Sequence, residues 1–273
     1  MAFPVVLYIN ILRTTGAVLA ASSTESGYSV NDICDYRAWK VWKSGTLVTG
    51  ITIDIDLGSD IGSADTIGLV NHNITSEGGT VELRADTSAG ANPPTTVRQA
   101  AYTPTYGEVD LQQFSTASNL RRWRIVLAKG GNFANKPHIG ELFLGLRTTL
   151  TEYMDPGLDP FLRQVDASVV QSHGGQYLGA VLRAKSHRFN LAFGDMGANR
   201  TAFTSDLNTF IDSHLMLRRP FIFQIDSADT DFKRPVYVKM AEGGEVKRNA
   251  VGGVWSRLTF SVSVEEAHAE AAS

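Results

Sequence analysis

Cysteine is almost absent from this sequence of 273 residues, and that scarcity narrows the chemistry available to it. Cys34 is the single cysteine, so the chain can form no internal disulfide and no zinc site built on several thiolates. A lone thiol also indicates folding in a reducing compartment. No partner pattern marks Cys34 as a nucleophile, and we therefore expect it to be a buried or bystander residue.

Long apolar runs and an excess of positive charge are missing as well. No stretch approaches the roughly 18–20 apolar residues that a membrane-spanning helix requires. The net charge is −3, with 25 basic and 28 acidic residues, whereas a dedicated nucleic-acid binder usually carries a basic face. Apolar residues make up 43% of the chain, which is enough to bury a core. We expect a globular protein that neither spans a membrane nor recognises nucleic acid.

The common catalytic motifs are also missing. The sequence contains no Gly-x-Ser-x-Gly elbow, no phosphate-binding loop ending in Gly-Lys-Ser/Thr and no Gly-x-Gly-x-x-Gly turn. Its six histidines are scattered, and no pair has the i, i+4 spacing that places two imidazoles on one helix face. We therefore expect no catalytic residue, no cofactor and no metal. The sequence does not indicate an enzyme.

Alternation of apolar and polar residues predicts that the first half is rich in strands. The pattern is clearest over residues 51–57, where one face is apolar and the other solvated. The stretch from Thr87 to Pro104 has no periodicity and is predicted to be a long polar connection. Short strands separated by Gly, Pro and Asn turns indicate a sandwich or jelly roll. The other strands predicted here cover residues 67–70, 80–85, 123–127 and 139–145.

The pattern changes after a predicted linker at residues 148–159. The best helix of the sequence covers residues 204–219, where an apolar stripe includes Phe210 and His214, and Pro220 stops it. We expect His214 to be a satisfied, partly buried histidine. Two strands are predicted before this helix, at 177–184 and 188–193, and three after it, at 221–226, 235–240 and 257–264. The whole chain is predicted to be mainly β, with domains at 1–150 and 151–273.

Two groups of acidic residues could hold a cation. Asp54 and Asp56 lie on one face of their strand, but such a pair is more often the wet face of a half-buried strand. Asp226, Asp229 and Asp231 loosely resemble a calcium loop, yet the glycine and distal glutamate of that loop are missing. We favour structural roles for both groups.

Aromatic rings beside polar side chains are the usual means of binding a sugar, because a pyranose face stacks on a flat ring. Trp39, Trp42 and Trp123 are the candidates. Trp123 alternates with core-facing residues and is expected to pack in the core, whereas the role of Trp42 stays open between packing and binding. His72 follows a strand and could line a loop pocket, although an exposed loop histidine is the simpler interpretation. The candidate ligand-binding residues are therefore Trp42, His72 and Arg37, with Arg122 and Arg124 as further hydrogen-bond donors.

Residues 16–146 resemble a discoidin-like, galactose-binding-type β-sandwich. The resemblance rests on Ser-Ser-Thr-Glu-Ser-Gly-Tyr at 22–28, Asp35-x-x-x-Trp39, Ile-Asp-Leu-Gly at 55–58, Trp-Arg-Ile-Val-Leu at 123–127 and Glu-Leu-Phe-Leu-Gly at 141–145. It implies a sandwich that binds sugars, lipids or proteins through variable loops at one end. In such domains a tryptophan at the position of Trp39 packs into the sandwich.

The second half resembles the β-sandwich-plus-helix unit of bacteriophage tail tubes and distal tail rings. The order of elements carries this resemblance: Arg-Phe-Asn-Leu-Ala-Phe at 188–193, the 204–219 helix, Pro-Phe-Ile-Phe at 220–223, a Val-Tyr-Val hairpin and a long final strand. Distal tail proteins often join such a ring-forming domain to a galactose-binding-type sandwich. Here the sandwich comes first, which is the reverse of the commoner order.

The resemblance implies a structural virion protein of the phage tail tip, made in the host cytoplasm. It would form a homo-oligomeric ring and contact the tail tube, tape-measure, hub and receptor-binding proteins. Open sheet edges agree with a ring, because rotated subunits can pair them. The Thr87–Pro104 connection would be an arm that reaches a neighbour, so deleting residues 88–98 is expected to weaken assembly and leave the monomer folded.

Two alternatives remain open. The first is a carbohydrate-binding adhesin whose first domain recognises a host surface glycan. The second is an accessory domain of a glycan-processing enzyme, which the lack of a catalytic constellation disfavours.

Overall fold

The structure is a computed structural model of the chain. It describes residues 3–58, 61–87, 93–150, 163–171, 177–193, 208–226, 228, 233–242, 244–251, 254–267 and 270–271. The chain is mainly β, as predicted, and the described strands pair antiparallel. It divides into two compact units, of which the first contains Val5–Thr149 and Ile222–Pro235, and the second Ala2–Pro4, Leu150–Phe221 and Val236–Ser273. The segment 222–235 thus lies with the first unit although it follows residue 150 in the sequence.

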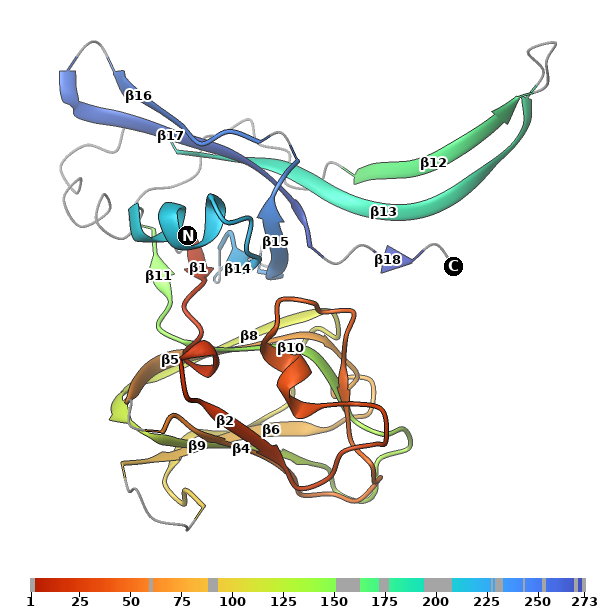
Figure 1. Cartoon of the computed structure of the whole chain (residues 1–273), viewed down its shortest axis with the longest axis vertical. Coiled ribbons are helices and arrows are strands. Elements are labelled where there is room, and N and C mark those ends of the chain that lie inside the picture. The colour runs from red at the N-terminus through yellow and green to blue at the C-terminus, as the bar shows by residue number, and fades with distance from the viewer. Residues whose placement is uncertain are drawn as a thin grey trace. The chain divides into compact units, whose positions relative to one another are not determined.

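The first unit contains a sandwich of two sheets (Figure 1). One sheet has the strand order β3-β10-β5-β8, formed by β3 (Trp42–Lys43), β10 (His138–Gly145), β5 (Gly62–His72) and β8 (Val109–Leu120). The other has the order β2-β4-β9-β6-β7, formed by β2 (Val18–Ala21), β4 (Ile51–Asp56), β9 (Arg122–Ala128), β6 (Thr80–Asp86) and β7 (Val97–Tyr102). Two 3-10 turns, η1 (Ile11–Arg13) and η2 (Val30–Cys34), belong to the same unit.

Register aligns the apolar residues of neighbouring strands into rows. Ile53 lies opposite Ile125, which lies opposite Leu83 on its other side, and all three are completely buried. Because side chains alternate along a strand, this register also puts Asp54 and Arg124 together on the outer face. One buried cluster joins residues of both sheets, including Trp42 and Trp123, so the two sheets share a core.

Strands β1 (Val5–Leu7), β11 (Thr148–Thr149) and most of β14 (Phe221–Gln224) also belong to the first unit. Strand β1 pairs with β11 on one side and with β14 on the other. Gly68 of β5 packs directly under it: an added Cβ would lie 2.4 Å from the Ile222 side chain.

The described strands of the second unit form an antiparallel sheet with the order β15-β17-β13-β12. Strand β16 also pairs with β17, and β18 with β13. Figure 1 draws β12 and β13 as a long curved pair. The bounds are β12 (Arg163–Gln171), β13 (Tyr177–Phe193), β15 (Val236–Met240), β16 (Lys247–Val251), β17 (Val254–Glu266) and β18 (Glu270–Ala271).

Helical structure is described from residue 208 onward, and η3 (Ile211–Leu215) continues it as a π-helical segment. The predicted stripe is confirmed for Phe210, Ile211, His214 and Leu215, which are buried. His214 places its Nδ1 atom 3.0 Å from the Ser213 hydroxyl and stacks on Phe210, as expected of a satisfied histidine. The predicted start at 204 and residues 151–159 of the predicted linker lie outside the described residues. The first two residues of that linker, 148–149, form β11 instead.

Two predictions about strands were wrong. The predicted strands at 177–184 and 188–193 form the single strand β13, because no glycine or proline interrupts Lys185-Ser186-His187. The supposed connection Thr87–Pro104 contains β7, which pairs with β6 although its sequence does not alternate. A deletion of residues 88–98 would therefore cut into a sheet strand, so it does not test an arm alone.

Candidate functional site

A polar cleft of about 590 Å³ opens among the loops at one end of the sandwich. Its walls come from four segments, near residue 25, at 43–47, at 73–77 and at 134–138. Cavities of this volume are typical of small-molecule sites. Most of the side chains that line it carry hydrogen-bond donors or acceptors, so the cleft suits a ligand rich in polar groups.

Glu25 joins two walls of the cleft. Its carboxylate lies 2.6 Å from the Lys136 Nζ atom and 3.0 Å from that of Lys43. The hydrogen bond from Lys136, followed by that from Lys43, holds the pKa of Glu25 below its usual value. Both lysines are about one-third exposed, so their remaining N–H groups can face solvent or a ligand.

Asn73 and Glu77 shape the opposite wall by holding the 134–138 loop. The Asn73 side chain donates to the Lys136 carbonyl at 3.1 Å and accepts from the His138 N–H at 2.9 Å. Glu77 accepts from the Asn135 side chain at 2.7 Å and from the Ala134 N–H at 2.8 Å. The Asn135 hydrogen bond is the main reason that the pKa of Glu77 is lowered.

The loop between η2 and β3 carries an exposed indole. Trp39 is 67% exposed, and the Arg37 guanidinium carbon lies 5.8 Å from the centre of its ring. Arg37 is paired with Asp35, and Lys40 with Asp32 at 2.5 Å. The expectation that Trp39 packs into the sandwich was wrong, because Trp42 fills that place in the core.

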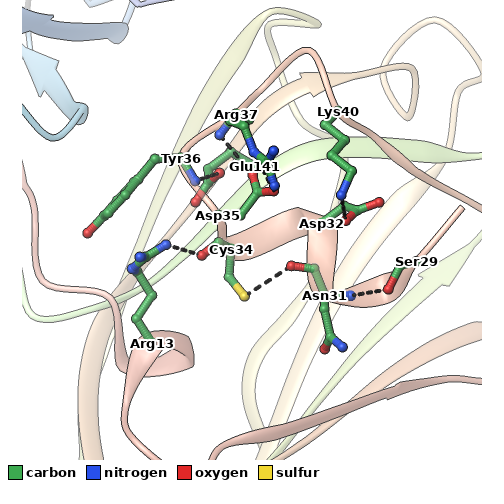
Figure 2. Close-up of polar contacts among 10 residues, drawn as sticks. All are labelled: Arg13, Ser29, Asn31, Asp32, Cys34, Asp35, Tyr36, Arg37, Lys40 and Glu141. Carbon is green, nitrogen blue, oxygen red and sulfur yellow. Dashed lines mark hydrogen bonds and ion pairs between the residues drawn. The ribbon is translucent and has the colours of Figure 1, made fainter.

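Three contacts hold this loop against β5 and β10. The buried Glu141 carboxylate accepts from the Tyr36 N–H at 2.7 Å, and Figure 2 shows it among Asp35, Tyr36 and Arg37. The Asn71 side chain donates to the Ala38 carbonyl at 2.7 Å. Gly140 lies so close to that carbonyl that an added Cβ would be 2.1 Å from its oxygen. The loop is therefore fixed through its backbone, which leaves the Trp39 side chain free to face solvent.

Burial governs the titration of two groups near this loop. Loss of water raises the pKa of Glu141 to about 9, with Asp35 acting in the same direction and Arg13 against it. Burial also raises the pKa of Cys34 to about 11, and its thiol donates to the Asn31 carbonyl at 3.4 Å. Cys34 is therefore protonated at neutral pH, in agreement with a bystander role.

The three predicted ligand-binding residues do not meet at one place. Trp42 is completely buried, and its indole N–H donates to the Thr24 hydroxyl at 3.1 Å. His72 is also buried, and desolvation lowers its pKa to about 4. Arg37 is exposed and lies beside Trp39. Of the three, Arg37 alone presents its charged group to solvent.

Sequence reasoning missed Trp39 and the cleft. Trp39 and Trp42 are three residues apart, and side chains at that separation point to opposite faces of an extended chain. That spacing indicates that one of the two tryptophans packs in the core of the sandwich, but it does not determine which one. The cleft joins segments more than 100 residues apart, such as Glu25 and Lys136, and no local pattern brings these together.

On the outer face of the β4–β9 sheet, both aspartates are paired with arginines, which agrees with a structural role. Asp54 forms a two-pronged pair with Arg124, at 2.5 Å and 2.6 Å. Asp56 is held by Arg121 at 2.7 Å and Arg122 at 2.9 Å, and the Arg121 hydrogen bond lowers its pKa.

Among the described residues, no group of three or more His, Cys, Asp or Glu side chains could hold a metal ion. The calcium-like Asp226–Asp231 segment is described only in part, and there the Asp226 carboxylate accepts from the Ala228 N–H at 2.8 Å. In the same part of the chain, no helix has the length and apolar character needed to cross a membrane.

Carbohydrate-binding modules are among the solved structures that are similar to part of this chain. Chitosan-binding module 1 of a chitosanase/glucanase from Paenibacillus sp. IK-5 is 18% identical, with a TM-score of 0.39, over 50% of this chain and 98% of the module. Module 2 of that enzyme, solved with chitotriose, is 20% identical, with a TM-score of 0.40, over 48% of this chain and 98% of the module. A fucosidase of Ruminococcus gnavus, solved with fucose, is 20% identical, with a TM-score of 0.39, over 51% of this chain.

That similarity spans 27% of the fucosidase chain. No family model matches this sequence, and no curated protein does.

Proposed function

We propose that this protein binds carbohydrate through the loop end of its first unit. The observation that carries the proposal is the polar cleft bounded by Glu25, Lys43, Asn73 and Lys136. Sugar hydroxyls both donate and accept hydrogen bonds, and the cleft offers carboxylate, ammonium and amide groups at fixed positions. The exposed indole of Trp39 supplies the flat apolar surface on which a pyranose ring stacks.

A glycan array probed with the full-length protein tests this function. The double variant Lys43→Met, Lys136→Met keeps the aliphatic stems and removes both ammonium groups from the cleft. Because a hydrogen bond to a charged group contributes about 1.5–3 kcal/mol, we expect the affinity for a bound glycan to fall at least about tenfold. Lys239→Met, in the second unit, is the matched control and should bind normally. Failure of the unaltered protein to bind any glycan would exclude the function.

We also propose, as a second function, that the second unit assembles copies of the chain into a ring at a phage tail tip. The observation that favours it is strand β12, which lies at the end of its sheet and, within the described chain, pairs with β13 alone. Such an edge exposes unpaired N–H and C=O groups that can pair with a neighbouring subunit. Subunits related by rotation would close into a ring through this contact. In that setting the protein would be part of the virion and contact tail-tube, tape-measure, hub and receptor-binding proteins.

Negative-stain electron microscopy of the full-length protein tests the second function. Closed rings with a central channel are the expected result. Monomers at every concentration, including the highest that can be reached, would contradict a ring that forms without other tail proteins.

A further inference from the structure

We infer that the ligand is an uncharged oligosaccharide that occupies the polar cleft and the Trp39 indole together. This inference rests on the proposed carbohydrate-binding function and specifies its substrate class. It follows from the adjacency of the two surfaces, their complementary chemistry and the balance of their charges.

The backbone anchors of the two surfaces are neighbours on two paired strands. At the end of β5, Asn73 lines the cleft, while Asn71 holds the Ala38 carbonyl next to Trp39. On β10, His138 lines the cleft, while Gly140 touches that same carbonyl. Ile139 pairs with His72. On either side of this pair, Asn73 therefore lies beside His138 at the cleft, and Asn71 lies beside Gly140 at the Trp39 loop. Two residues of a strand span about 7 Å, and the anchors of the two surfaces are therefore adjacent but separate.

The size of the cleft points to more than one sugar ring. Its volume of about 590 Å³ lies in the range that accommodates a drug-sized ligand, which is larger than a single hexose. Trp39 does not line the cleft, so a ligand that fills the cleft alone would make no use of the indole. A chain of several rings can place one ring in the cleft and stack another on the indole.

The two surfaces complement the two kinds of surface that a sugar presents. The cleft contributes charged and amide groups, which match hydroxyls at the edge of a ring. Trp39 contributes a wide rigid indole, which matches the apolar face. Because Glu141, Asn71 and Gly140 hold the backbone of its loop, the loop loses little backbone freedom on binding, and this preorganisation favours affinity.

Charge balance points to an uncharged ligand. The cleft is lined by two lysines, Lys43 and Lys136, and by two glutamates, Glu25 and Glu77. Beside Trp39, Arg37 and Lys40 are paired with Asp35 and Asp32. His138 adds no charge at neutral pH, because burial lowers its pKa. A polyanion would meet no net positive charge at either surface. A neutral glycan can use the free hydrogen-bonding positions and leave the ion pairs intact.

Calorimetric titration of the full-length protein with oligosaccharides of increasing length tests the inference. The probes are monomer-to-hexamer series of cello-, chito-, manno- and galacto-oligosaccharides. In the series that binds, we expect affinity to rise at least about tenfold from the monosaccharide to the longer members. Trp39→Ala should abolish that rise and preserve monosaccharide binding, whereas Lys43→Met, Lys136→Met should weaken binding at every length. Ile61→Ala removes another exposed apolar side chain of the first unit and is the control.

The outcomes separate the inference from the function on which it rests. Affinity that is independent of length and unaffected by Trp39→Ala would overturn the two-surface site and leave carbohydrate binding intact. Tighter binding of oligogalacturonates than of neutral galacto-oligosaccharides would overturn the uncharged ligand. The absence of binding to every series, with a folded protein confirmed by its thermal transition, would overturn the proposed function itself.

Discussion

Trp39 and Trp42 belong to adjacent regions of the first unit, a loop and the strand that follows it, and they have opposite environments. Trp42 begins β3, is completely buried and satisfies its indole N–H on Thr24. Trp39 lies in a loop that is bound through its backbone and is 67% exposed. The comparison shows that a side chain is available to a ligand only where other groups hold its segment in place. Side-chain anchoring makes Trp42 part of the core, whereas backbone anchoring leaves Trp39 available to a ligand.

The largest expected difference between the two regions is in stability. Trp42→Ala should lower the free energy of unfolding by about 3–5 kcal/mol, because it leaves a cavity in the core. Trp39→Ala should change it by no more than about 0.5 kcal/mol, because the indole is mostly in water. Chemical denaturation of both variants measures the difference. Equal losses of stability would show that Trp39 also packs against the sandwich.

The pH dependence of stability tests the buried carboxyl beneath the loop. Burial raises the pKa of Glu141 to about 9 from a usual 4.5, so the native state keeps a proton that the unfolded state loses. Its contribution to stability should therefore fall as pH rises from about 4.5 to 9, with a slope of up to about 1.4 kcal/mol per pH unit. Besides burial, Asp35 raises this pKa, whereas the backbone N–H groups of Tyr36 and Arg37 and the charge of Arg13 lower it.

Glu141→Gln is the matched variant, because glutamine retains the oxygen that accepts from the Tyr36 N–H and cannot ionise. Denaturation curves between pH 5 and 9 should be flatter for the variant than for the unaltered protein. Parallel curves would mean that Glu141 is ionised in the folded state, in which case burial does not control it.

The smallest of the three effects on stability is expected at Gly140. An added Cβ would lie 2.1 Å from the Ala38 carbonyl oxygen, and a backbone atom cannot move aside as a flexible side chain can. Gly140→Ala should cost about 1–3 kcal/mol and displace the loop, which would weaken the binding that depends on Trp39. Gly130→Ala is the control, since an added Cβ there meets nothing within 4 Å. If Gly140→Ala has normal stability and normal oligosaccharide affinity, the close contact between Gly140 and the Ala38 carbonyl does not hold the loop.

Much of the sandwich could be predicted because strand periodicity is local. The alternation at 51–57 predicted β4 and its buried face, and the structure places Ile51, Ile53 and Ile55 in the core. Strand β7 escaped prediction because its residues do not alternate and its pairing with β6 is a tertiary contact. Of the candidate site, only Arg37 was recognised in advance as a residue available to a ligand.

The sequence by itself determined the strand-rich character, the apolar face of residues 51–57 and the place of Asp54 and Asp56 on the opposite face, because each of these follows from a period of two residues. It could not determine which tryptophan is exposed, or that Glu25 meets Lys136 across 111 residues. Tertiary structure decided both. The exposure of Trp39 depends on Asn71, Gly140 and Glu141, and the cleft exists because loops distant in sequence converge at one end of the sandwich.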